Sequence, residues 1–161
     1  MQEIDVEAPI GDRHVGGLDQ GRSCANLREG VDVLEGPHTF DVAQFEAQGN
    51  WRERIPAGFH LQLVDAALAE QTSILASWAS LEDFQANGVG FALLEGGEIA
   101  STCTSVFASR ERVEIDVHTE EKYQRRGFAV ITASALIEAC LQRGKQPNWE
   151  CFWDNEPSTA L

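Results

Sequence analysis

The sequence predicts a layered α+β domain built on a mostly antiparallel sheet. The first observation is a hairpin, in which strand-like runs at 89–95 and 98–107 flank Gly96-Gly97, a pair that tolerates the positive φ angles of a two-residue turn. The second is the alternating run 112–119 (RVEIDVHT), which extends the hairpin to a three-stranded meander. The third is the segment 128–141, which is apolar nearly all round a helix and is therefore expected to be buried on more than one side.

The region before the hairpin supplies a strand and several short helices. Residues 58–65 alternate apolar and polar side chains, as in a half-buried strand, and 66–71 and 72–79 form short helical pieces. Ser80 with Asp83 resembles a capping box, and the helix that it opens stops at Asn87-Gly88.

After the long helix, Arg143-Gly144 marks its end and 147–153 (PNWECFW) is predicted to form one more strand. The last residues, 154–161, begin like a helix, with Asp154 or Asn155 as the cap and Pro157 near the first turn.

Residues 1–50 differ in character from the rest. They hold ten acidic and three basic residues and seven of the 14 glycines, with poor apolar periodicity apart from a short helix expected within 39–48. We interpret 1–50 as an N-terminal arm or the remnant of an upstream region, partly disordered, and 51–161 as the folded domain.

Charge and composition restrict the partners. A net charge of −14 repels nucleic acid and anionic lipid surfaces and attracts amines. No apolar stretch is long enough for a membrane helix and no signal peptide is visible, which predicts a cytoplasmic location. The four cysteines show no C-x-x-C spacing and the four histidines are scattered, so we expect reduced, buried thiols and no metal site.

A basic glycine turn, 123–129 (YQRRGFA), connects the third strand of the meander to the long helix. A helix N-terminus offers unpaired N–H groups, Gly127 lets the backbone approach an anion closely, and Arg125 and Arg126 add charge-assisted hydrogen bonds. An ordinary loop with solvated arginines remains the alternative.

These motifs together resemble a known family. Gln124-x-x-Gly127-x-Ala129, placed after a meander and before a buried helix, resembles the pyrophosphate loop of the GNAT (GCN5-related) N-acetyltransferases. The stretch from 114 to 158 is similar to the branch that includes the zwittermicin A resistance acetyltransferases. The resemblance covers about residues 56–161 and implies a mixed, mostly antiparallel sheet with helices on both faces.

The resemblance also implies a binding site for acetyl-CoA. In this fold the cofactor lies where two parallel strands diverge, with its pantetheine arm along the end of the fourth strand and its pyrophosphate on the loop. The positions that match are Val117, His118, Thr119, Gln124, Arg125, Arg126, Gly127, Phe128, Ala129, Asn155 and Ser158.

Candidate catalytic groups lie on the strand before the loop. Alternation places Glu114, Asp116 and His118 on one face, where they would relay a proton from an amine through water. Glu114 is the first choice of base and Asp116 the second. A solvated polar strand face is the competing interpretation.

The chain departs from the family at its C-terminal end. A helix that often carries a tyrosine acid, and a final strand, would follow Leu161, so we expect a truncated domain with an exposed sheet edge and pairing of two copies through that edge. The predicted function is acetyl-CoA-dependent N-acetylation of a primary amine of a small molecule, a class that includes antibiotic-like amines. The alternative is a non-catalytic acyl-CoA-binding or interaction module of the same fold.

Overall fold

The computed structural model describes residues 40–150 and shows a five-stranded sheet with strand order β1-β2-β3-β4-β5. The strands are β1 Phe59–Leu63, β2 Gly90–Glu95, β3 Glu98–Ala108, β4 Arg112–Thr119 and β5 Gln146–Asn148. The first four pair antiparallel, and β5 pairs parallel to β4. The predicted mixed, mostly antiparallel α+β sheet is confirmed.

The meander forms as its turn chemistry requires. Gly96 and Gly97, at φ 59° and 92°, close the β2–β3 hairpin in the left-handed region that glycine adopts without steric cost. The strand predicted at 147–153 is seen as Gln146–Asn148; residues 149 and 150 are not part of a strand, and residues 151–153 lie outside the described part of the chain.

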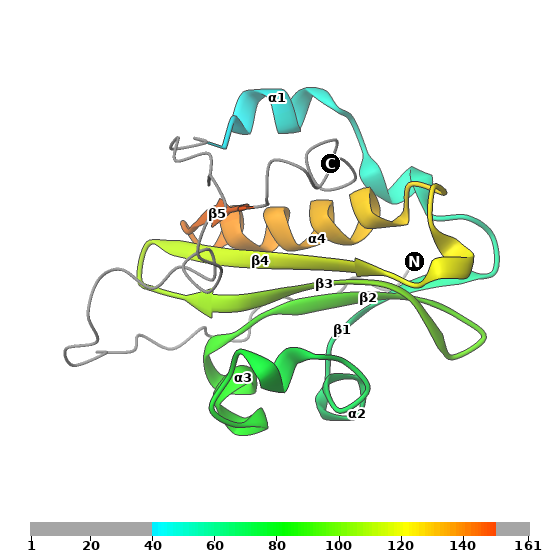
Figure 1. Ribbon diagram of the computed structural model, residues 1–161. Helices are drawn as coiled ribbons and strands as arrows, with labels where there is room; N and C mark the ends of the chain where they lie inside the picture. The colour runs from blue at the N-terminus through cyan, green and yellow to red at the C-terminus, as the bar shows by residue number, and fades with distance from the viewer. Residues whose placement is uncertain (1–39, 151–161) are drawn as a thin grey trace, which may run out of the picture.

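Helices cover both faces of the sheet (Figure 1). On one face lies α4, Phe128–Gln142, with α1 (Val42–Ala47) and the 3-10 helix η2 (Trp51–Arg54) on its outer side. The other face carries α2 (Ala66–Ala69), the 3-10 helix η3 (Ile74–Ala76) and α3 (Leu81–Asn87). A further 3-10 helix, η4 (Glu121–Tyr123), precedes α4.

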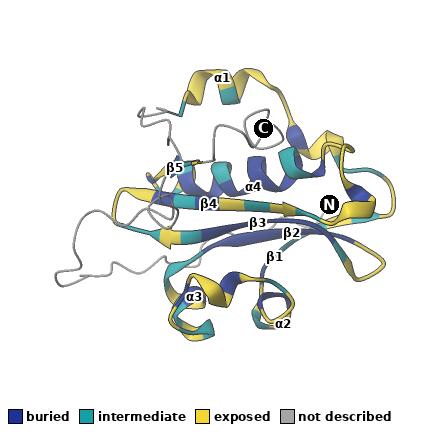
Figure 2. Cartoon of the chain, in the orientation of Figure 1, coloured by how far each residue is buried: buried dark blue, intermediate teal, exposed yellow. Residues whose placement is uncertain are grey.

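Each face has its own hydrophobic core. The larger cluster joins Phe91, Leu93, Val113 and Ile115 of the sheet to the buried side of α4, and the smaller one joins Ala92 and Leu94 to α2, η3 and α3. Burial is deepest in α4 and in the central strands (Figure 2). The prediction that the long helix is buried on more than one side is confirmed, since α4 lies between the sheet and the segment that holds η2.

Helix ends follow the predicted signals. The Ser80 hydroxyl accepts a hydrogen bond from the Asp83 amide at 3.2 Å and opens α3. Gly144, at φ 65°, ends α4, and its amide donates to the Leu141 carbonyl.

Candidate functional site

Within residues 40–150, only the first three residues of β4 pair with β5. Pairing with β5 runs only from Arg112 to Glu114, opposite Gln146 to Asn148. From Ile115 to Thr119, β4 has no strand partner on this side within residues 40–150. The backbone of Val117, His118 and Thr119, which the family resemblance places beside the cofactor, lies in this part of β4.

The loop after β4 presents backbone amides at the start of α4. Gly127 is the N-cap of this 15-residue helix, at φ 77°, and no side chain caps the helix there. The first helical bond runs from the Ile131 amide to the Gly127 carbonyl at 3.4 Å, so the amides of Phe128 and Ala129 precede the helical bonding pattern. A Cβ added at Gly127 would meet nothing within 4 Å, so open space faces the cap.

A hydrogen bond connects the loop to the strand. The Gln124 side-chain amide donates to the Thr119 carbonyl at 3.2 Å. The structure therefore brings together the end of β4 and the glycine loop, the two segments expected to share one ligand.

The two arginines of the loop are exposed but differ in their surroundings. The Arg126 guanidinium lies over the rings of Phe128, Phe59 and Tyr123, at 4.7, 5.3 and 5.6 Å from their centroids. Arg125 adopts φ 60°, an uncommon conformation for a residue with a Cβ. Stacking orients Arg126 beside the loop, an arrangement that sequence spacing did not predict.

Glu114 and Asp116 occupy different environments on β4. Glu114 is half-buried, and the Asn148 side-chain amide of β5 donates to its carboxylate at 2.5 Å. Burial raises the pKa of Glu114, although the Asn148 hydrogen bond acts in the opposite direction. Asp116 is exposed, and His118 Nε2 lies 3.4 Å from Glu120 at the solvent surface.

The described cysteines are not nucleophiles. Cys103 and Cys140 are buried free thiols, as predicted. Burial raises the pKa of Cys140 to about 12 and that of Cys103 well above its ordinary value, so neither forms a thiolate at neutral pH. Cys24, Cys151, Asn155 and Ser158 lie outside the described residues.

A family comparison identifies the domain. The family model for GNAT acetyltransferases matches residues 28–161. The chain belongs to this family. The GNAT fold predicted from the motifs is thus confirmed, and the match begins within the segment that we interpreted as an arm, a boundary that stays a prediction.

Two relatives of the chain are longer than the chain itself. An uncharacterized N-acetyltransferase, YdfB of Bacillus subtilis, is 33% identical over 114 residues, covering 67% of this chain and 44% of YdfB. A GCN5-related N-acetyltransferase-like protein from Streptococcus suis has a TM-score of 0.65 and 27% identity, over 75% of this chain and 49% of its own. The chain therefore spans about half the length of these relatives.

A third structure shares only the fold. It is a predicted acetyltransferase from Clostridium acetobutylicum with acetyl-CoA, with a TM-score of 0.51 and 14% identity over 63% of this chain and 86% of its own. Within residues 40–150 of the GNAT chain, no helix is long and apolar enough to cross a membrane, and no three metal-binding side chains gather.

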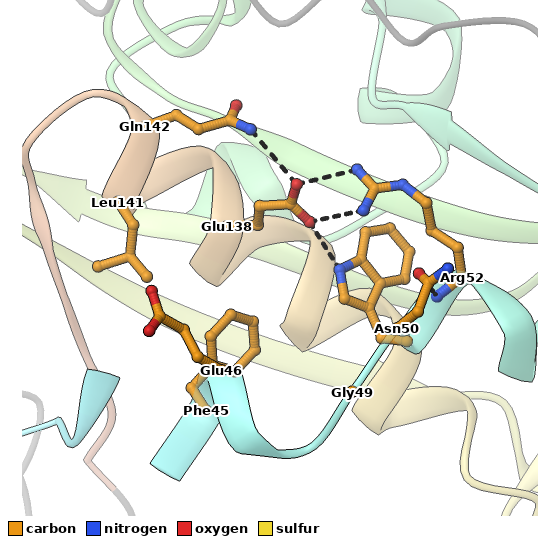
Figure 3. Close-up of a pocket in the computed structure, with 9 residues that line it drawn as sticks. Phe45, Glu46, Gly49, Asn50, Arg52, Glu138, Leu141 and Gln142 are labelled. Atoms are coloured by element: carbon orange, nitrogen blue, oxygen red, sulfur yellow. Dashed lines mark hydrogen bonds and ion pairs between the residues drawn. The ribbon is translucent and has the colours of Figure 1, made fainter. Parts of the chain in front are cut away.

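A cavity that the sequence did not predict lies on the outer side of α4 (Figure 3). It has a volume of about 450 Å³ and is lined by Phe45, Glu46, Gly49, Asn50, Trp51, Arg52, Glu138, Leu141 and Gln142. The Glu138 carboxylate accepts hydrogen bonds from Trp51 Nε1 at 2.7 Å and from both Arg52 terminal nitrogens at 2.8 and 3.0 Å. Because Trp51 and Glu138 are 87 residues apart, no local pattern connects them, and the cavity is separate from the β4 edge.

Proposed function

We propose that the chain carries the acetyl-CoA site of an N-acetyltransferase that modifies a primary amine of a small molecule. The observation that carries the proposal is the Gln124–Thr119 hydrogen bond, which holds the end of β4 beside the N-terminus of α4, where no side chain caps the helix. We further infer a place in the zwittermicin A resistance-like branch from the EIDVHT strand and the YQRRGFA loop.

The residues present fit such a cofactor. The backbone of Val117, His118 and Thr119 would pair with the pantetheine arm, and the amides of residues 124–129 would bind the pyrophosphate, assisted by the α4 dipole. The open space in front of Gly127 admits a phosphate group that a larger side chain would displace.

Bound acetyl-CoA would supply a thioester as the acetyl donor. Acetylation then requires a neutral amine: its nitrogen bonds to the acetyl carbon, the carbon–sulfur bond breaks, the amine loses a proton and the departing thiolate gains one. Half-burial and a raised pKa support Glu114, rather than exposed Asp116, as the acceptor of the amine proton. Asn148 orients the Glu114 carboxylate.

Calorimetric titration with acetyl-CoA tests the site. The wild-type chain should bind, and Gly127→Glu should lower the affinity at least tenfold, about 1.4 kcal/mol, because a carboxylate would occupy the pyrophosphate position. Gly144→Glu is the matched control: this glycine has a similar φ of 65° and equally open space, but it lies at the other end of α4.

Equal loss of acetyl-CoA binding in both variants, or undiminished binding by Gly127→Glu, would contradict the assignment of this loop as the pyrophosphate site. Binding by the wild type without acetylation of a broad panel of amines would instead support the non-catalytic acyl-CoA-binding module.

A further inference from the structure

Three hydroxyl side chains lie between the end of β4 and the first turn of α4. Ser101 of β3 is paired with Thr119 of β4 in the strand register, and their hydroxyl oxygens are 2.9 Å apart. The hydroxyl oxygen of Thr132, on α4, lies 3.3 Å from that of Ser101. We call Ser101, Thr119 and Thr132 the hydroxyl triad. It joins β3, β4 and α4 at one point.

The triad also bonds to the backbone of both segments proposed to bind the cofactor. The Ser101 hydroxyl donates to the His118 carbonyl at 3.0 Å. The Thr132 hydroxyl donates to the carbonyls of Phe128 and Ala129, at 3.3 and 3.2 Å. Because a hydroxyl has only one proton, Thr132 accepts at its contact with Ser101. The triad therefore connects the backbone at the end of β4 to the backbone of the first turn of α4.

The two central members of the triad are inside the protein. Ser101 and Thr132 are each 0% exposed, and Thr119 is half-buried. A buried hydroxyl that loses its partner costs about 1–3 kcal/mol, and hydrogen bonds in a low-dielectric interior are stronger than those in water. The triad therefore restricts how far the end of β4 can move relative to α4. Since a bound ligand does not reach Ser101 or Thr132, these two residues act only through the segments that they hold.

Thr119 is fixed from two sides. Its hydroxyl contacts Ser101 inside the fold, and its carbonyl accepts the hydrogen bond from the exposed Gln124 side chain. The next amide, that of Glu120, donates to the Ala100 carbonyl at 3.1 Å, so β4 is still bonded to β3 where the loop begins. Water can replace the exposed Gln124 hydrogen bond, whereas the buried contacts of the triad exclude water.

We propose that Ser101 and Thr132 are positioning residues, which set the distance between the strand that pairs with pantetheine and the amides that bind the pyrophosphate. This inference rests on the proposed acetyl-CoA site. A ligand that spans two half-sites gains affinity from the link only when their spacing matches its own length. Loosening the triad should therefore weaken the binding of whole coenzyme A, while each half-site still binds its own fragment of the cofactor.

The test measures three ligands on the full chain by NMR titration: coenzyme A, ADP, which carries the pyrophosphate, and pantetheine. Thr132→Val removes the hydroxyl and keeps the branched shape. It should weaken coenzyme A binding about threefold or more, the value of one hydrogen bond, and leave the affinities for ADP and pantetheine unchanged. Thr132→Ser keeps the hydroxyl and should restore the binding of coenzyme A.

Thr72→Val is the matched control. The Thr72 hydroxyl donates to the carbonyl of Ala69, three residues earlier, at 2.9 Å, as the Thr132 hydroxyl donates to that of Ala129. Thr72 is half-buried and lies between α2 and η3, on the other face of the sheet. This variant should keep the wild-type affinity for all three ligands.

Ser101→Ala breaks the triad from β3 and should reproduce the pattern seen with Thr132→Val, so it supplies the same comparison if Thr132→Val does not fold. Melting temperatures separate positioning from stability alone. A lower melting temperature with wild-type affinity for coenzyme A would show that the triad only stabilises the fold and would overturn the inference. Equal weakening of all three ligands would also overturn it, because the half-sites themselves, rather than their spacing, would then be changed.

Failure of the proposed function has a different result. If the folded wild-type chain binds none of the three ligands, the proposed acetyl-CoA site is wrong, and the positioning role of the triad is overturned with it. If the wild type binds coenzyme A and Thr132→Val binds it equally well, only the inference about the triad is overturned and the proposed site stands.

Discussion

At the scale of single residues, burial separates two carboxylates that the strand pattern treats alike. Glu114 and Asp116 share one face of β4, but only Glu114 is half-buried and bonded across to β5 through Asn148. Desolvation disfavours the charged form of Glu114, which is what a general base near neutral pH needs.

Glu114→Gln tests this difference. We expect kcat to fall by about 10²–10⁴-fold, the usual contribution of a positioned general base. In the wild type, the rate should rise with pH through the raised pKa of Glu114, since the ionised carboxylate is the active form, and the variant should lose this dependence. A pH–rate profile checks both points, and an unchanged kcat in a folded variant would exclude Glu114 as the base.

At the scale of elements, the site depends on how β4 ends and on how α4 begins. In the described part of the chain, β5 pairs with β4 only as far as Glu114, and the left-handed Gly127 turns the chain into α4 without a capping side chain. Gln124 fixes the loop against Thr119 from an exposed position, so its contribution to global stability is small.

Gln124→Ala should therefore weaken acetyl-CoA binding without unfolding the chain. Loss of one hydrogen bond is worth about 0.5–1.5 kcal/mol, which corresponds to an affinity about two- to twelvefold lower. Gln71→Ala is the matched control, because the Gln71 side chain also donates to a backbone carbonyl, that of Ala67 at 2.9 Å, at an exposed site on the other sheet face. If calorimetry gave equal acetyl-CoA affinities for the two variants, the Gln124–Thr119 hydrogen bond would have no role in the site.

At the scale of the whole molecule, Glu138 connects the segment before β1 to the main helix. Trp51 and Arg52 both donate to its carboxylate, and Arg52 also stacks on the Trp51 ring at 4.3 Å (Figure 3). Partial burial would raise the pKa of Glu138, but the hydrogen bonds from Arg52 and Trp51 outweigh it and lower the pKa.

Glu138→Gln should lower the free energy of unfolding by about 1–3 kcal/mol at neutral pH. Because the pKa of Glu138 is lowered in the fold, its stabilisation is present above the ordinary carboxyl range and is lost as the pH falls through the folded value. Urea denaturation at neutral and acidic pH should show the difference between variant and wild type shrinking in acid.

Glu46→Gln provides the comparison for this prediction, since Glu46 lines the same cavity but its side chain forms no hydrogen bond or ion pair within the described residues. Similar losses of stability in both variants would show that the loss of a negative charge at the cavity, rather than the loss of the Glu138 hydrogen bonds, lowers the stability.

The sequence by itself determined the meander, the buried helix and the glycine loop, because turn chemistry and apolar periodicity act between residues close in the chain. Gly96-Gly97, Ser80 and Gly144 all form the turns and caps that their types predict. The family follows from these local motifs in their order.

Only the tertiary structure decided which of these residues meet others far away. The stacking of Arg126 on Phe59, the Asn148–Glu114 bond and the Trp51–Glu138 cluster depend on register and on packing between elements. Burial and cross-strand contacts are set by the packing of α4 against the sheet and by strand register. Local sequence patterns therefore do not predict them directly.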